Sequence, residues 1–238
     1  MKVRTNKCFI CNQCLTFHIT YFSIVVFLGL FKKHEKDGRV ILPLLATLDK
    51  LLTHEYLDEV LAANSGSFCS KLVACIAKEA KSCSDIKRLL AMVGVSLALL
   101  QPNHEFMSKM RVEIFPFIMT MLLNPYPRVR RYTAEQLYVK LVEDGEIMFD
   151  GDTCVIDANQ ILLNTVWHDK QDPHGDMSAG MNRIADLLGI VLSEEQRNVK
   201  LKKGSGGSWS VTTIRMNSSH IPALLIMHKK HILMIYDC

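Results

Sequence analysis

Apolar residues recur every three or four positions in one segment after another, and this spacing constrains the fold more than any other feature. Residues 39–53 carry one apolar stripe, and Thr47, Asp49 and Lys50 occupy the opposite face. The stripe consists of Ile41, Leu44, Leu45, Leu48, Leu51 and Leu52. Such spacing is typical of amphipathic helices. Between residues 39 and 200 we find no sustained apolar–polar alternation of the kind that predicts strands. The sequence therefore predicts an all-α fold. Further helical segments are expected at 67–82, 84–100, 106–123, 127–143 and 177–189.

The predicted helices come in pairs that are separated by short polar breaks. The pairs over 67–100 and 106–143 follow each other at about 40 residues, the period of HEAT and armadillo repeats. Two helices of one pair cannot bury their apolar faces alone, so such pairs stack on their neighbours. We therefore expect an α-solenoid of HEAT/armadillo-like helix pairs.

Capping residues mark where several of these helices begin and end. Gly189 closes the helix over 177–189, because glycine is favoured just after a helix. Pro116 lies inside the segment 106–123, where it is expected to kink the helix. The expected N-terminal caps are Ser84, Asp157 together with Gln160, and Ser193 together with Gln196.

The charges divide the chain into three zones. Residues 1–38 contain six basic and two acidic residues, and residues 201–238 contain five and one. The totals are 28 basic and 24 acidic residues, so residues 39–200 hold 28−6−5 = 17 basic and 24−2−1 = 21 acidic ones. A folded body with net negative charge argues against nucleic-acid binding, which needs a basic face. We predict a helical repeat domain over 39–200, an N-terminal segment over 1–38, and a Gly/Ser linker with a tail over 201–238.

The N-terminal segment contains a run without formal charge from Cys8 to Phe31. The densest part, residues 15–31, could span a membrane as a signal anchor. A buried helix, or a segment outside the body's fold, explains the same residues. A membrane-anchored helical protein therefore stays as an alternative, and membrane association is not the expected outcome.

The stretch "NPYPRVRR" has the composition of a tight turn between two paired helices. Asn124 can cap or turn, and Pro127 suits the first helical position, where a missing N–H costs nothing. Val129 is expected in the core, and the fork of donors on Arg130 beside it can reach the carboxylate or amide of a neighbouring turn. We interpret Asn124, Pro127, Val129 and Arg130 as the structural joint of a repeat.

Two more arginines of this stretch face other directions. Arg128 and Arg131 are expected to be solvated, and both are candidates for contact with an acidic partner. They are the only partner-binding residues that the sequence singles out.

Two clusters have the residue types of a metal site. Cys8, Cys11, Cys14 and His18 have the spacing of soft zinc ligands, but no second C-x₂-C pair completes a finger. The other cluster reads more simply as a polar loop with a turn at Pro173 and Gly175; its members are His168, Asp169, Asp172, His174 and Asp176. We therefore predict no metal, no cofactor and no catalytic residue.

Several blocks, taken in order, resemble one known family. They are "RVILPLLATLDKLL", "SDIKRLLAMVGVSLALLQ", "PYPRVRRYTAEQLYVKL", "LLNTVW" and "MNRIADLLGI". Together they are similar to the C-terminal region of tubulin-folding cofactor D, over roughly residues 39–198. The two ends of the chain do not share this resemblance.

The resemblance implies a cytoplasmic HEAT-repeat scaffold of the microtubule cytoskeleton. Members of this family hold β-tubulin, work with other tubulin-folding cofactors in αβ-heterodimer assembly, and stimulate GTP hydrolysis by tubulin. They also bind an Arf-like small GTPase, and they carry no active site of their own. The other interpretation of the same helices is a HEAT scaffold unrelated to tubulin.

Overall fold

The computed structural model describes residues 25–63, 67–101, 106–149, 152–169 and 175–198. These residues form helices and connecting turns, and no strand occurs among them. The predicted all-α class is therefore confirmed. A helical stretch at 25–33 comes first. It is followed by α2 (Gly38–Thr53), α3 (Asp58–Ala63), α4 (Ser67–Lys81), α5 (Ile86–Ala98), α6 (Met107–Leu122), α7 (Pro127–Met148), α8 (Asp152–Asn164), α9 (Asp176–Leu187) and α10 (Glu194–Arg197).

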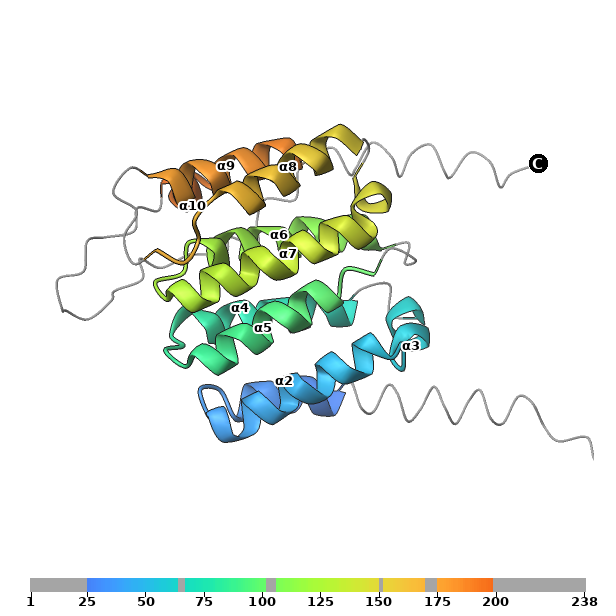
Figure 1. Cartoon of the computed structure of the whole chain (residues 1–238). Helices are drawn as coiled ribbons and strands as arrows, with labels where there is room; N and C mark the ends of the chain where they lie inside the picture. Colours follow the sequence, from blue (N-terminus) through green and yellow to red (C-terminus); the bar gives the residue numbers. More distant parts are fainter. Residues whose placement is uncertain (1–24, 64–66, 102–105, 150–151, 170–174, 199–238) are drawn as a thin grey trace, which may run out of the picture. The chain divides into compact units, whose positions relative to one another are not determined.

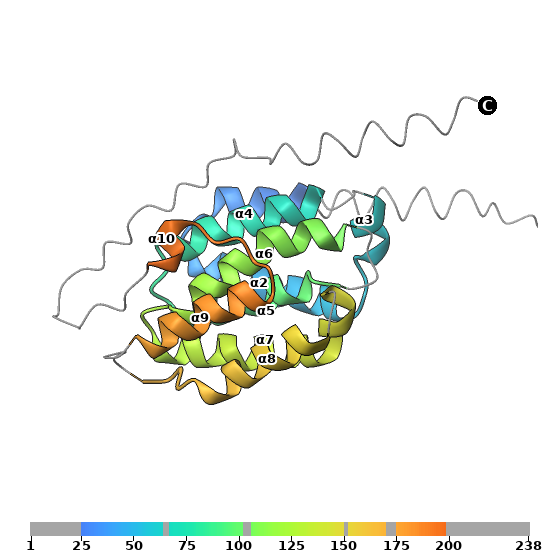
Figure 2. The same cartoon turned by 90° about the horizontal axis from the view of Figure 1, so that it is seen from above.

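The helices stack in two layers (Figures 1 and 2). In one layer α2 packs on α5, α5 on α7 and α7 on α8. In the other layer α4 packs on α6 and α6 on α9. The contacts α4–α5, α6–α7 and α8–α9 join the layers into pairs. This stack of helix pairs is the architecture expected of an α-solenoid.

The core lies between the two layers and is built by the apolar stripes that define the helices in the sequence. The buried residues of α2 all belong to the predicted stripe, whose remaining member, Leu51, is half-buried; they are Ile41, Leu44, Leu45, Leu48 and Leu52. Leu89 and Val93 of α5 and Ile114 and Ile118 of α6 are also completely buried. These helices therefore bury their apolar faces against their neighbours, which is the main source of helix stability in proteins.

The last pair breaks the order of the earlier ones. In the pairs α4–α5 and α6–α7 the chain enters one layer first and then the other. After α7 it stays in the same layer, because α8 packs directly on α7, and only α9 returns to α6. Gly145 allows the close approach of α7 and α8: a Cβ atom built there would lie 2.6 Å from Cγ1 of Val155.

Helix α10 is tied back to α6. Pro116 lies inside α6, and its carbonyl accepts a hydrogen bond from Oγ1 of Thr120 at 2.9 Å. The Gln196 side chain reaches the same carbonyl at 3.5 Å. The predicted capping box of Ser193 and Gln196 is present and sets the start of α10.

Two predicted caps are wrong. Helix α5 is capped by Asp85, whose side chain accepts a hydrogen bond from the N–H of Lys87, and not by Ser84. Asp157 lies inside α8, which begins five residues earlier, at Asp152. At α5 the neighbouring acceptor Asp85 takes the position expected for Ser84. Gly189, by contrast, has the left-handed φ of 62° expected after a helix.

The described part of the N-terminal segment belongs to the stack. Phe31 is buried in the core with only 4% of its surface exposed. The backbone N–H of Lys36 donates to Oε2 of Glu79 in α4 at 2.9 Å. The boundary expected at residue 38 therefore falls inside a packed region, and residues 25–37 contact the first helix pairs.

Candidate functional site

Asn124 and Pro127 build the turn between α6 and α7. Oδ1 of Asn124 accepts a hydrogen bond from the N–H of Tyr126 at 3.0 Å, so the side chain closes the turn. Pro127 is the first residue of α7. Its ring fixes φ at a helical value, and no intrahelical bond is lost at that position. The local sequence thus sets the angle at which α7 leaves the turn.

Arg130 lies in the first helical turn of α7, and only 1% of its surface is exposed. Its Nη1 donates to the carbonyls of Asn124 at 2.7 Å and Pro125 at 3.2 Å. Its Nε donates to the carbonyl of Trp167 at 3.0 Å, and its Nη2 donates to the carbonyl of Asp169. The guanidinium therefore joins the α6–α7 turn to the segment that follows α8. Only arginine carries five donors in one rigid plane, and this site uses three of its nitrogens.

The segment whose carbonyls accept hydrogen bonds from Arg130 is itself held in place. Trp167 is buried, and its ring N–H donates to the carbonyl of Leu162 at 2.9 Å, near the end of α8. On the other side, Val129 is completely buried, and Oγ1 of Thr133 donates to its carbonyl at 2.8 Å. Contacts from the α6–α7 pair and from the segment after α8 thus both hold the joint in place. The sequence did not reveal the acceptors, because they are backbone carbonyls.

The two candidate contact residues lie on the solvent side of α7. Arg131 forms an ion pair with Glu135, from Nε to Oε1 at 2.7 Å, and both side chains are more than half exposed. Arg128 is exposed, and its side chain makes no ion pair within the described residues. Exposed pairs at this spacing contribute about 0.3–0.5 kcal/mol, so neither arginine is needed for the fold. Both remain accessible to a partner.

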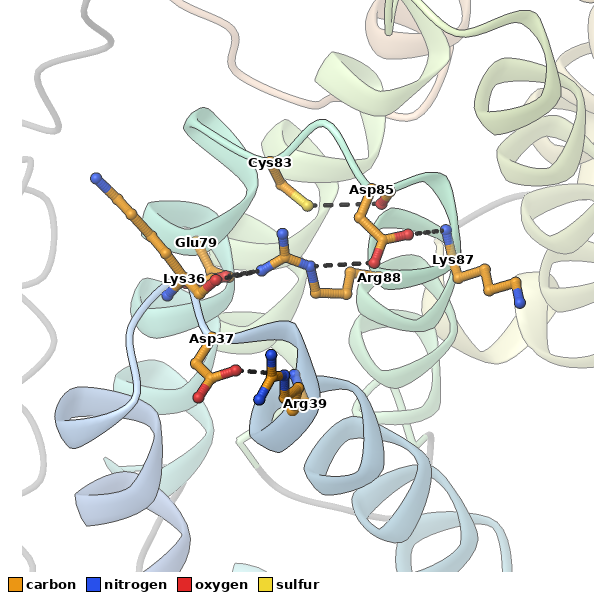
Figure 3. Close-up of polar contacts among 8 residues, drawn as sticks. All are labelled: Lys36, Asp37, Arg39, Glu79, Cys83, Asp85, Lys87 and Arg88. Atoms are coloured by element: carbon orange, nitrogen blue, oxygen red, sulfur yellow. Dashed lines mark hydrogen bonds and ion pairs between the residues drawn. The ribbon is translucent and has the colours of Figure 1, made fainter.

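A second buried polar cluster links residues 35–37 to α4 and α5 (Figure 3). Glu79 is 4% exposed and pairs with Nη1 of Arg88 at 2.7 Å. Arg88 also donates to the carbonyl of Lys36 at 3.2 Å, while the N–H of Lys36 donates to Glu79. Lys36 has a left-handed φ of 69°. Glu79 and Arg88 therefore hold a turn that most residues avoid.

The Glu79–Arg88 cluster was not foreseen from the sequence. Arg88 lies near the start of α5, as Arg130 does near the start of α7. Arg88 reaches back to residues before α2, whereas Arg130 reaches forward to the segment after α8. The only sequence signal was an arginine shortly after a helix start, and that pattern does not identify an acceptor. Asp37 and Asp85 cap α2 and α5 beside the cluster.

A shallow hollow opens at the end of α2. It has a volume of about 390 Å³ and is lined mostly by apolar surface. Its lining residues are Ala46, Thr47, Lys50, Leu51, His54 and Tyr56. A groove this open and this poor in polar groups lacks the convergent donors and acceptors that small-molecule sites use.

The described cysteines have the properties of small core residues. Burial raises the pKa of Cys69 to about 12. Burial also raises the pKa values of Cys75 and Cys83 above the ordinary thiol value. A thiol is nucleophilic only as the thiolate, so these three cysteines are not activated nucleophiles.

The two clusters that were weighed as metal sites are only partly described. Cys8, Cys11, Cys14 and His18 lie outside the described residues, as do Asp172 and His174. His168 and Asp169 are exposed, and the backbone of Asp169 serves Arg130. Among the residues that the structure describes, no group of three His, Cys, Asp or Glu side chains could hold a metal ion.

The alternative interpretation, a membrane-anchored protein, concerns residues 15–31, of which 15–24 are not described. None of the helices in the described ranges combines the length and the apolar character that crossing a membrane requires.

Comparison with known proteins gives one family. Residues 23–88 match the family model described as the tubulin folding cofactor D C-terminal region. The suspected resemblance to this region is thereby confirmed over these residues. The match begins at residue 23, ahead of residue 39, where the sequence blocks placed the start of the resemblance. It includes α2, α4 and the Glu79–Arg88 pair, whereas the α6–α7 joint lies beyond it. No solved structure matches the chain.

Proposed function

We propose that this chain is a scaffold related to tubulin-folding cofactor D that binds β-tubulin after its release from the chaperonin. The observation that carries the proposal is the family match over residues 23–88. In this role the chain assists αβ-heterodimer assembly together with other tubulin-folding cofactors, in the cytoplasm and at the microtubule cytoskeleton. An Arf-like small GTPase is a further partner by the same reasoning.

The architecture supports recognition through a surface. Stacked helix pairs present an extended row of helices, and such rows bind large partners through many side chains with a few anchors. In this chain α2, α5, α7 and α8 form such a row. Arg128 and Arg131 lie exposed on α7 in that row, where they could meet an acidic segment of tubulin.

The proposal assigns no chemistry to the chain itself. Stimulation of GTP hydrolysis would act through tubulin, whose own residues carry the reaction. Cys69, Cys75 and Cys83 are not activated thiols, and no catalytic arrangement is expected from the sequence. Steady-state GTP hydrolysis by tubulin, measured with and without the purified chain, tests this part: the chain alone should release no phosphate.

Retention on immobilised tubulin subunits tests the binding. The purified chain should be retained by β-tubulin, and replacing both Arg128 and Arg131 by glutamate should weaken retention about tenfold, as expected for contact residues with a combined effect near 1.4 kcal/mol. The matched control is Arg183→Glu, a change of an exposed arginine on α9 in the other layer.

Two outcomes speak against the proposal. A chain that is helical by circular dichroism, but is retained by neither tubulin subunit nor an Arf-like GTPase, contradicts cofactor function and favours a HEAT scaffold unrelated to tubulin. Equal loss in the Arg183→Glu control would show a general charge effect and remove Arg128 and Arg131 as contact residues.

A further inference from the structure

Large apolar side chains are exposed mainly at one end of the stack. Of the eleven that are exposed in the described part of the chain, six lie between residues 139 and 166. Val142, Ile156 and Leu163 are 59%, 54% and 66% exposed. Isolated exposed apolar residues are normal, but a concentration of them marks an interaction surface.

Four of these residues gather where α7 and α8 meet, and we call Val139, Val142, Ile156 and Leu163 the α7–α8 patch. The closest approach of the two helices is at Gly145 and Val155. Val142 precedes Gly145 by one helical turn, and Ile156 directly follows Val155. Val139 and Leu163 lie one and two turns further along the same helices, which places them on the same faces. Both views show α7 and α8 side by side (Figures 1 and 2).

The surroundings of the patch are acidic. Helix α8 contains no lysine or arginine, and the single lysine of α7 after Tyr138 is Lys140, which is bound to Asp144 at 2.6 Å. Glu143, Glu146 and Asp157 are exposed in the same stretch, and none of the three forms an ion pair within the described residues. Their charges are therefore available to a partner.

We propose that the α7–α8 patch binds an amphipathic helix of a partner protein whose apolar face is flanked by lysine or arginine. Two antiparallel helices with apolar side chains at their seam accept a third helix, whose anchors are spaced at i, i+3 or i+4, and i+7. The acidic residues around the patch favour a basic helix and disfavour an acidic one, because complementary charges give specificity. This inference is drawn from the exposed apolar and acidic residues of α7 and α8, and it does not rest on the proposed tubulin function.

Fluorescence anisotropy with three synthetic peptides tests the inference. The first is about four helical turns long, with leucines on one face and lysines on its flanks. The second has glutamate in place of each lysine, and the third has the composition of the first in a non-amphipathic order. We expect the first peptide to bind the full chain at least about tenfold more tightly than either of the others, a difference of about 1.4 kcal/mol.

Variants locate the site. Ile156→Asp and Leu163→Asp should each lower the affinity of the lysine peptide at least about tenfold, as expected for anchors at the centre of an interface. Val112→Asp is the matched control: it adds the same charge at a 73% exposed valine on α6, in the other layer, and should leave binding unchanged. Circular dichroism confirms that each variant is folded, and Leu163→Ser replaces any variant that is not.

Three results would overturn the inference. They are equal binding of all three peptides, unchanged binding in both α8 variants, or equal loss in the Val112→Asp control. Sedimentation velocity over a range of concentrations provides one more check. A chain that dimerises, and whose dimer is disrupted by Leu163→Asp, would show that a second copy occupies the patch instead.

Discussion

At the scale of single residues, two buried arginines hold segments that helix packing alone would leave free. Arg130 donates to carbonyls of both the α6–α7 turn and the segment that follows α8, and so joins the last two helix pairs. Arg88 pairs with buried Glu79 and holds the turn at Lys36. Buried charges are costly to leave without partners, so such contacts are sensitive to the loss of one member.

We expect Arg130→Met to destabilise the protein by about 2–4 kcal/mol, because the carbonyls of Trp167 and Asn124 lose a donor inside the protein. Urea unfolding, monitored by circular dichroism, measures the change in the free energy of unfolding. Arg128→Met on the exposed side of α7 is the control and should stay within about 0.5 kcal/mol of the parent. Equal effects of the two changes would contradict the role assigned to Arg130.

The exposed pair of Glu35 and Lys78 gives a pH prediction. The hydrogen bond from Lys78 at 2.7 Å lowers the pKa of Glu35 below its ordinary value of 4.5. A lowered folded-state pKa means that the pair stabilises the protein above pH 4.5 and loses this effect as the pH falls through the lowered value. An NMR titration of Glu35 should show the lowered pKa, and Lys78→Gln should return it towards 4.5. A Glu35 titration that Lys78→Gln leaves unchanged would refute this cause.

At the scale of elements, the path from α7 to α8 depends on one glycine. Gly145 is buried in the interior of α7, where glycine is otherwise unfavourable. The helix α8 lies so close that no side chain fits at this position. This close contact keeps α8 in the layer of α7 and forms the seam at which the α7–α8 patch lies.

Gly145→Ala should therefore destabilise the protein by about 1–3 kcal/mol, since overpacking outweighs the gain in helix propensity. Val155→Ala in the same chain should restore part of this loss, because it removes the atoms that the new methyl group meets. Thermal unfolding of the two single variants and the double variant gives the coupling. Gly29→Ala is the control, as nothing lies within 4 Å of a Cβ atom there, and it should not destabilise. Additive effects of Gly145→Ala and Val155→Ala would contradict the close contact.

The sequence predicted the helices better than their arrangement. The stripe of Leu44, Leu48 and Leu52 identified α2, because its period is visible in a single segment. The change of order in the last pair could not be predicted, since it depends on the contact between Gly145 and Val155, which lie on different helices. The same reason applies to the site. The turn at Asn124 and Pro127 was readable locally, whereas the carbonyls of Trp167 and Asp169, which also accept hydrogen bonds from Arg130, lie 37 and 39 residues away.

At the scale of the whole molecule, we propose two separate binding surfaces. The exposed Arg128 and Arg131 contact tubulin, and the α7–α8 patch binds a basic helix. The family match covers α2, α3, α4 and the start of α5, up to residue 88. The α7–α8 patch and the α6–α7 joint lie beyond it. Arg128 and Arg131 precede the first residue of the patch, Val139, by at least two helical turns of α7. We therefore expect variants of the patch to leave binding of tubulin intact, and Arg128 and Arg131 variants to leave binding of the lysine peptide intact. Loss of both activities in each variant, with the fold retained, would contradict two separate surfaces.

The central claim is that this chain binds β-tubulin as a scaffold related to tubulin-folding cofactor D. Sedimentation velocity of the purified full chain mixed with purified tubulin tests it most directly. We expect a new, faster-sedimenting species that contains both proteins, and its amount should fall when Arg128 and Arg131 are replaced by glutamate. Two separate boundaries at every concentration, from a chain shown to be helical and folded, would contradict the claim.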